Sequence, residues 1–171
     1  FLAHGLLELH ASTGDSAWIE KAVAIAGRAI RIFGDPEAGG FFDTDGSDET
    51  VLVRMKERHD GAEPSGNAIA SAVLIRLAAL TGGQEWRRAA EATWKGFQPW
   101  LDRQPSVLPL MTATVQGAAG KSSQLVIVGP PEHAETRGLL REYWTRFLPD
   151  TVLITAGDPG VQTSLSRIAP F

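Results

Sequence analysis

The sequence contains no cysteine. This absence excludes disulfide bonds, thiolate zinc sites and thiol nucleophiles within the chain, and it favours a reducing compartment, so we expect a cytoplasmic protein. No apolar run approaches the roughly 20 residues that a membrane-spanning helix needs. Residues 1–7 also lack the basic leader of a signal peptide. We therefore expect no membrane partner.

An excess of basic charge and a set of metal ligands are also missing. The formal net charge is -4, and the 16 Lys and Arg residues are scattered, which argues against nucleic acid as a partner. His4 and His10 are six residues apart on one predicted helix, about 120° from a common face. The acidic residues 43–48 lack EF-hand spacing, because glycine stands fourth and Arg54 stands twelfth. We expect neither a metal nor a cofactor.

The composition that is present is typical of a folded domain. With 43% hydrophobic and 21% charged residues, the chain can bury a core, and we expect residues 1–171 to form one domain. The sequence starts without methionine inside a helical apolar pattern. It ends at Phe171 with no terminating element. We therefore expect it to be the C-terminal part of a longer protein.

A helical hairpin occurs near the start of the chain. Leu2, Leu6 and Leu9 share one helical face, and residues 18–33 keep the three-and-four spacing of an amphipathic helix. The run Gly34-Asp35-Pro36 ends that second helix. Two helices joined by a short turn are therefore predicted.

The hairpin recurs after a shift of 68 positions. Helices are accordingly predicted from about residue 67 to 80 and from about 84 to 101. Repeated hairpins stack so that neighbours bury each other's apolar faces. We expect a mainly α fold that is part of an α/α toroid. The aligned pairs are Leu6 with Leu74, Leu9 with Leu77, Ala11 with Ala79, Thr13 with Thr81, Gly14 with Gly82, Trp18 with Trp86 and Ala22 with Ala90.

A long connector separates the two hairpins, from residue 34 to 66. Its runs 39–43 and 51–54 flank the turn-rich residues 45–48, which predicts a small β-hairpin. Loops of this length inside compact domains usually carry function. We expect any ligand site to lie here.

The last third of the chain has a different pattern. A shorter helix is predicted over residues 105–116. After a small-residue linker, β-runs at 125–128 and 151–155 flank a helix over 132–147. This order predicts a βαβ unit with parallel strands. We therefore divide the domain into helical hairpins with their β-hairpin, residues 1–117, and a βαβ-containing tail, residues 118–171.

Three motifs of the connector carry a family resemblance. They are GGFFDTD at residues 39–45, VRMKE at 53–57 and DGAEPSGN at 60–67. The resemblance covers nearly the whole chain, including the strand VIVG at 126–129. The chain resembles the thioredoxin-domain-containing, spermatogenesis-associated protein family. Met55 departs from the proline that the family often has there.

The resemblance implies an architecture. In that family a thioredoxin-like domain precedes a six-hairpin α/α toroid, which is similar to those of N-acylglucosamine 2-epimerases and several glycoside-processing enzymes. This chain would hold the last part of the toroid and none of the thioredoxin-like part. Its first partner would then be the missing N-terminal part of the same protein.

Polar residues of the connector form the candidate site, since loops that enter the inner helices of such a toroid gather at one mouth. Free amides at a helix start favour anionic or hydroxyl-rich ligands, although Ser65 or Asn67 can equally serve as an N-cap. Charges of both signs suit acid/base chemistry on a sugar, or simply an exposed charged strand. The catalytic candidates are Lys56, Glu57 and Asp60, and the ligand-binding candidates are Asp43, Arg54, Ser65 and Asn67. His4 joins the ligand-binding candidates because the start of the first helix could reach the same mouth, or it is simply a buried histidine with its hydrogen bonds satisfied.

Two functions from different classes follow. In the first, the intact protein binds or processes a sugar-like small molecule by epimerase-like or hydrolase-like chemistry. In the second, the chain is a non-catalytic scaffold that supports a thioredoxin-like domain or docks a protein. Unstacked hairpins also expose apolar surface, so the chain could self-associate through its cut face.

Overall fold

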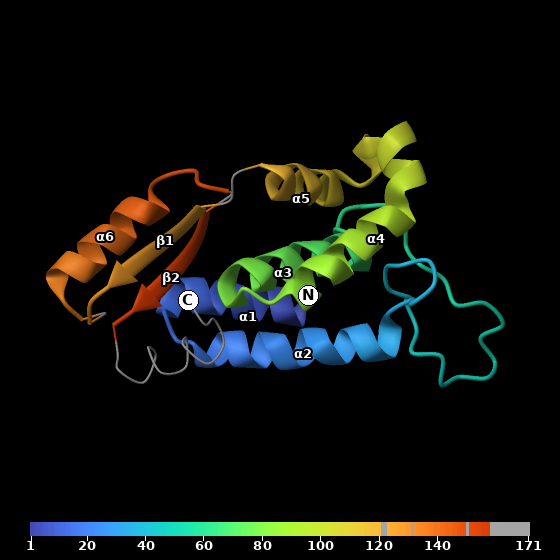
Figure 1. Cartoon of the computed structure of the whole chain (residues 1–171), viewed down its shortest axis with the longest axis horizontal. Coiled ribbons are helices and arrows are strands. Elements are labelled where there is room, and N and C mark those ends of the chain that lie inside the picture. The colour runs from blue at the N-terminus through green and yellow to red at the C-terminus, as the bar shows by residue number, and fades with distance from the viewer. Residues whose placement is uncertain (121–122, 131, 150, 158–171) are drawn as a thin grey trace.

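The computed structural model describes residues 1–120, 123–130, 132–149 and 151–157. Within these ranges no helix combines the length and the apolar character needed to cross a membrane. The fold is mainly helical, with one small sheet (Figure 1). In chain order the elements are α1 (Leu2–Thr13), α2 (Ala17–Phe33), α3 (Gly66–Thr81), α4 (Gln84–Arg103), the 3-10 helix η1 (Pro105–Val107), α5 (Pro109–Ala119), β1 (Ser123–Val128), α6 (Ala134–Trp144) and β2 (Thr151–Ala156).

Both predicted hairpins are confirmed, α1 with α2 and α3 with α4. Each first helix ends at a glycine in the left-handed region, Gly14 at φ 73° and Gly82 at φ 67°. A residue without a Cβ adopts this conformation at little cost, and it closes the helix end. The two glycines are equivalent in the repeat, so the same local signal ends both helices.

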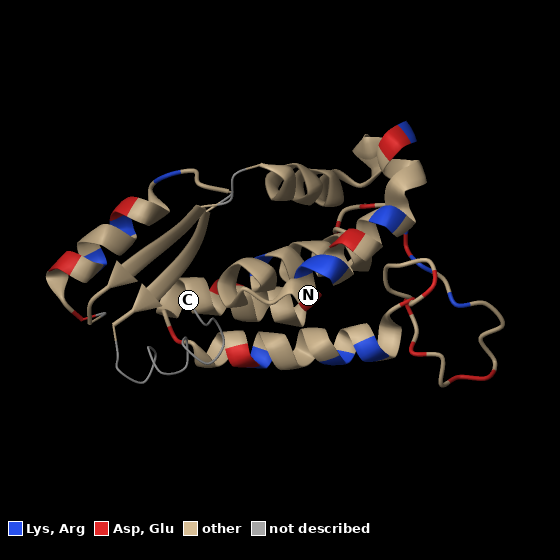
Figure 2. Ribbon diagram, in the orientation of Figure 1, with Lys and Arg blue, Asp and Glu red and all other residues tan. Residues whose placement is uncertain are grey.

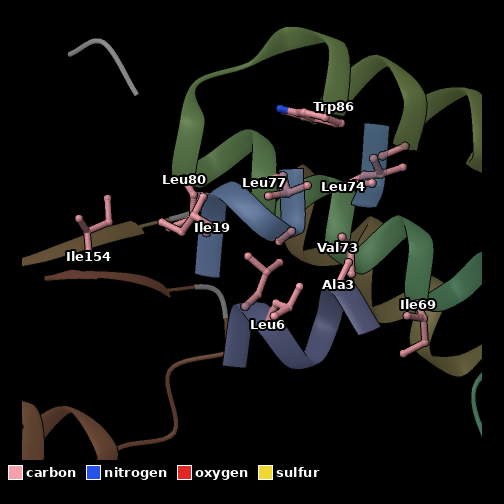
Figure 3. Close-up of a cluster of buried hydrophobic side chains, with 14 residues drawn as sticks. Ala3, Leu6, Ile19, Ile69, Val73, Leu74, Leu77, Leu80, Trp86 and Ile154 are labelled. Carbon is pink, nitrogen blue, oxygen red and sulfur yellow. The ribbon is translucent and has the colours of Figure 1, made fainter. Parts of the chain in front are cut away.

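Helix α3 lies at the centre of the molecule and contacts α1, α2, α4, α5 and β2. Figure 3 shows Ala3 and Leu6 of α1, Leu74 and Leu77 of α3, and Trp86 of α4 meeting in one buried cluster. Burial of a leucine side chain such as Leu74 or Leu77 contributes about 1.5–3 kcal/mol to stability. The two hairpins therefore lie side by side on a shared core.

The tail forms the predicted βαβ unit. Strands β1 and β2 are parallel, from Ser123 opposite Thr151 to Val128 opposite Ala156, and α6 lies between them in the chain. Strand β2 packs on the helices, because Ile154 joins the central cluster. The tail thus contributes to the same core as the hairpins.

The predicted β-hairpin of the connector is wrong. Runs 39–43 and 51–54 form no paired strands, and the segment's bridge joins Gly34 to Phe41 instead. The apolar side chains that would anchor a hairpin are solvent-exposed, Leu52 at 94% and Val53 at 69%. A two-stranded hairpin without packing partners is marginal in water. The connector is therefore an irregular loop, which in Figure 1 extends beyond the ends of α2 and α4.

Candidate functional site

A cleft of about 570 Å³ lies where the connector meets the helices. We call it the connector cleft. Its walls come from the starts of α1 and α3, from the second half of α2 and from connector residues. The lining is mostly apolar, and it includes Phe33, Phe41 and Phe42. A concave, largely apolar surface with few polar groups is the common form of a small-molecule site.

Three predicted site residues line this cleft, namely Asp43, Glu57 and Asn67. Both carboxylate residues are exposed. The backbone N–H of Glu57 donates to Asp43 Oδ1 at 3.3 Å, and the N–H of Asp43 donates to the carbonyl of Met55 at 2.8 Å. These contacts hold the two acidic residues next to each other across an irregular loop. The cleft thus combines an apolar wall with two exposed acids.

Asn67 holds the connector against α3. Its side chain is 1% exposed, its Oδ1 accepts from the N–H of Phe41 at 2.7 Å, and its Nδ2 donates to the carbonyl of Phe41 at 2.9 Å. The hydroxyl of Ser65 accepts a hydrogen bond from the N–H of Ala68 at 3.2 Å, so Ser65 is the N-cap of α3. The N-cap was one of the two roles predicted for this residue. Both side chains are thereby used to position the backbone around the cleft.

Arg54 and Lys56 meet on the ring of Phe42. The Arg54 guanidinium carbon lies 4.1 Å and the Lys56 amine 4.8 Å from the ring centroid, distances at which a cation is attracted to an aromatic face. Arg54 also donates to the carbonyl of Thr44 at 3.1 Å. Lys56 donates to Asp35 Oδ2 at 2.7 Å, and this hydrogen bond is the main reason that the pKa of Asp35 falls to about 2. Both cations therefore brace the connector.

Asp60 ties the connector to α5. One carboxylate oxygen accepts from the N–H of Ser65 at 2.8 Å, and the other accepts from the N–H of Leu110 in the first turn of α5 at 3.1 Å. The N–H of Asp60 donates to the carbonyl of Val107 at 2.8 Å. A carboxylate at a helix start is also favoured by the helix dipole. Asp60 lies outside the lining of the connector cleft.

His4 lies in a different place, in a second cleft on the other side of α1 and α3. Its Nε2 is 3.9 Å from a carboxylate oxygen of Glu8, which is ion-paired with Arg76. Sequence reasoning missed Glu8 and Arg76. The 68-position shift carried the signal, because it places Arg76 over Glu8.

Charge is unevenly distributed among the helices, as Figure 2 shows. Helices α1, α3 and α5 together contain just two Asp, Glu, Lys or Arg residues, Glu8 and Arg76, whereas α2 and α4 are rich in them.

Within the described ranges, no group of three or more His, Asp or Glu side chains is arranged to hold a metal ion.

The sequence of the chain is similar to those of several known proteins. No protein-family model matches it. Over the whole chain, it is 34% identical to spermatogenesis-associated protein 20 of Mus musculus and 32% identical to the Homo sapiens protein of that name, and each match covers 22% of the relative. It is also 33% identical to an uncharacterised Caenorhabditis elegans protein, over 83% of the chain and 20% of that protein. The chain therefore spans 22% of the length of the mouse and human relatives. It is a homologue of spermatogenesis-associated protein 20 along its entire length.

Proposed function

We propose that this chain forms part of an α/α toroid, with α1, α3 and α5 as inner helices and α2 and α4 as outer ones. The uneven distribution of charge supports this arrangement, because an inner helix is covered on all sides whereas an outer helix faces solvent on one. Buried positions occur on most sides of α3, among them Ala68, Ile69, Ser71 and Leu77. The six-hairpin toroid that the family resemblance implies supports it further.

The proposed function is to bind a hydroxyl-rich, carbohydrate-like molecule in the connector cleft. The observation that carries this proposal is the pair of exposed acids, Asp43 and Glu57, at a cleft whose other walls are apolar and aromatic. Carboxylates accept hydrogen bonds from hydroxyl groups, and aromatic rings cover the apolar face of a sugar ring. In the longer protein the same two carboxylates would be available for proton transfer to or from the sugar.

Lys56 and Asp60 have no direct part in this proposal. Each already holds backbone or an opposite charge, so substituting either would disturb the connector before it disturbed a ligand. Asp43 and Glu57 are therefore the residues on which a test should act.

The test is a titration of the chain with glucose, mannose and N-acetylglucosamine, followed by NMR of the backbone amides. Saturable shifts are expected at Gly66 and Asn67, which line the cleft. Asp43→Asn and Glu57→Gln should each weaken binding about tenfold, since a hydrogen bond to a charged group contributes about 1.5–3 kcal/mol. Asp48→Asn is the control, because Asp48 is an exposed connector acid outside the cleft lining. Equal affinity in all three variants, or no saturable shift with any sugar, would overturn the proposal.

A scaffold is the second candidate function. The observation that favours it is that the side chains of five predicted site residues are hydrogen-bonded within the protein and position the connector; they are Arg54, Lys56, Asp60, Ser65 and Asn67. A braced loop of this kind suits docking of a protein domain. In that case a thioredoxin-like domain of the family, added in place of sugar, should shift the connector amides, and no sugar should.

A further inference from the structure

The second cleft, of about 450 Å³, lies between the helical hairpins and the tail. We call it the tail cleft. It is lined by residues of α1, α3, α4, α5, α6 and β2, and Val73 is the one residue it shares with the connector cleft. Its volume falls in the range typical of small-molecule sites. The two clefts are therefore separate candidate sites.

The tail cleft carries an excess of positive charge. Its lining contains Glu8, Arg76 and Arg87. Arg76 is paired with Glu8 and donates to the carbonyl of Leu7 at 3.2 Å. Arg87 is half-buried, and it has no carboxylate within ion-pairing distance among the residues that the structure describes. Among the described residues, Arg87 is thus a guanidinium without a counter-charge in a concave site.

Two aromatic side chains also line the tail cleft, and we call them the aromatic corner. Tyr143 and Trp144 of α6 both line the cleft, with ring centroids 4.9 Å apart and planes at 77°. The Tyr143 hydroxyl donates to the carbonyl of Thr151 at 3.2 Å, which holds the corner against β2. Trp144 remains 51% exposed. A large aromatic surface left open in a cleft offers a stacking wall for a ring.

We infer that the tail cleft binds a small molecule that joins one carboxylate or phosphate group to an apolar ring. A guanidinium binds planar acids with two parallel hydrogen bonds, and this assigns the acid group to Arg87. The ring then packs on Trp144 and Tyr143. Because the walls come from both the hairpins and the tail, the bound molecule should also hold the tail in place. The inference does not depend on sugar binding in the connector cleft.

Four probe molecules distinguish the contribution of the acid group to binding from that of the ring. Phenyl phosphate and benzoate carry both an acid and a ring, inorganic phosphate carries the acid alone, and benzyl alcohol carries the ring alone. Calorimetric titration of the chain should give saturable binding of phenyl phosphate or benzoate, at least tenfold tighter than either partial probe. Which of the two binds more tightly identifies the acid group. The indole signal of Trp144 in NMR should shift with the bound probe.

Matched variants locate the site. Arg87→Gln should lower affinity at least tenfold, whereas Arg88→Gln, the exposed neighbour outside the cleft lining, should leave it unchanged. Glu8→Gln should tighten binding, because it removes a negative charge from the cleft lining that repels the ligand's acid group. Circular dichroism of each variant shows that the fold is intact. The inference is overturned if Arg87→Gln and Arg88→Gln bind equally, or if inorganic phosphate binds as tightly as both ring-bearing acids.

Discussion

Glu8 of α1 and Arg76 of α3 occupy equivalent positions, 68 residues apart, in the two helical hairpins, and they form an ion pair with each other. Both helices begin at the connector cleft, which is lined by Leu2 and Ala3 of α1 and by Gly66 and Asn67 of α3. The two helices therefore run parallel and in register. Two residues that occupy equivalent positions in the sequence repeat are therefore in direct contact in the structure.

This pair should contribute little to stability, and a double-mutant cycle measures how much. Glu8 and Arg76 are 49% and 26% exposed, so water screens most of their attraction. We expect a coupling of about 0.2–1 kcal/mol between Glu8→Gln and Arg76→Gln in urea unfolding. Parallel register would then come mainly from the apolar core. A coupling of about 3 kcal/mol or more, as a buried pair shows when it is broken, would contradict this.

Replacing Asn67 should loosen the connector. Asn67→Ala removes the hydrogen bonds to both the N–H and the carbonyl of Phe41. Loss of two buried hydrogen bonds should lower the free energy of unfolding by about 2–4 kcal/mol. Hydrogen exchange at Phe41 should accelerate as well. The control is Ser47→Ala in the exposed turn, where a change within about 0.5 kcal/mol is expected. Similar values for the two variants would show that the Asn67 contacts do not hold the loop.

Gly39 allows the connector to approach α4. It has φ 74°, and a Cβ there would lie 2.0 Å from the carbonyl oxygen of Ala92. Gly39→Ala should therefore lower the free energy of unfolding by about 2–4 kcal/mol through backbone strain and steric overlap. Gly5 is the matched control, since it lies inside α1 and a Cβ added there would meet no atom within 4 Å. Gly5→Ala should stabilise the protein by about 0.5–1 kcal/mol. Thermal unfolding of the two variants should move in opposite directions.

Acid should weaken the contact between Asp35 and Lys56. The pKa of Asp35 is lowered from 3.8 to about 2, first by the hydrogen bond from Lys56 and then by the N–H of Ala38. A lowered pKa in the folded state stabilises the fold above pH 3.8, and this contribution is lost as the pH falls towards 2. Urea unfolding at several pH values should show the loss in the wild type. In Asp35→Asn that part of the pH dependence should be absent, and an unchanged pH profile would contradict the role of Asp35.

Much of the fold could be predicted from local signals. The apolar spacing of residues 18–33 marks α2, and glycines at 14 and 82 mark two helix ends, because these signals act within a few residues of the chain. The β-hairpin in the connector could not be judged in this way. Whether strands form there depends on a surface on which Leu52 and Val53 could pack, and both side chains remain exposed in the described part of the chain.

The candidate site, like the fold, could be predicted from the sequence only in part. The sequence could nominate Asp43, Glu57 and Asn67, because polar residues in a long loop before a helix are a visible pattern. It could not show that Arg54 and Lys56 both turn to the ring of Phe42. Which partner a charged side chain chooses depends on distances across the fold.

The sequence by itself therefore determined the helices, the repeated hairpin and the parallel βαβ tail, since periodicity, turn glycines and strand order are properties of the chain. Only the tertiary structure decided which charges are engaged and which remain available for a ligand. It placed Asp43 and Glu57 at one cleft and Arg87 with Trp144 at another. The physical reason is that a cleft is formed by surfaces from distant segments, and the neighbours of a side chain exist only after these segments pack.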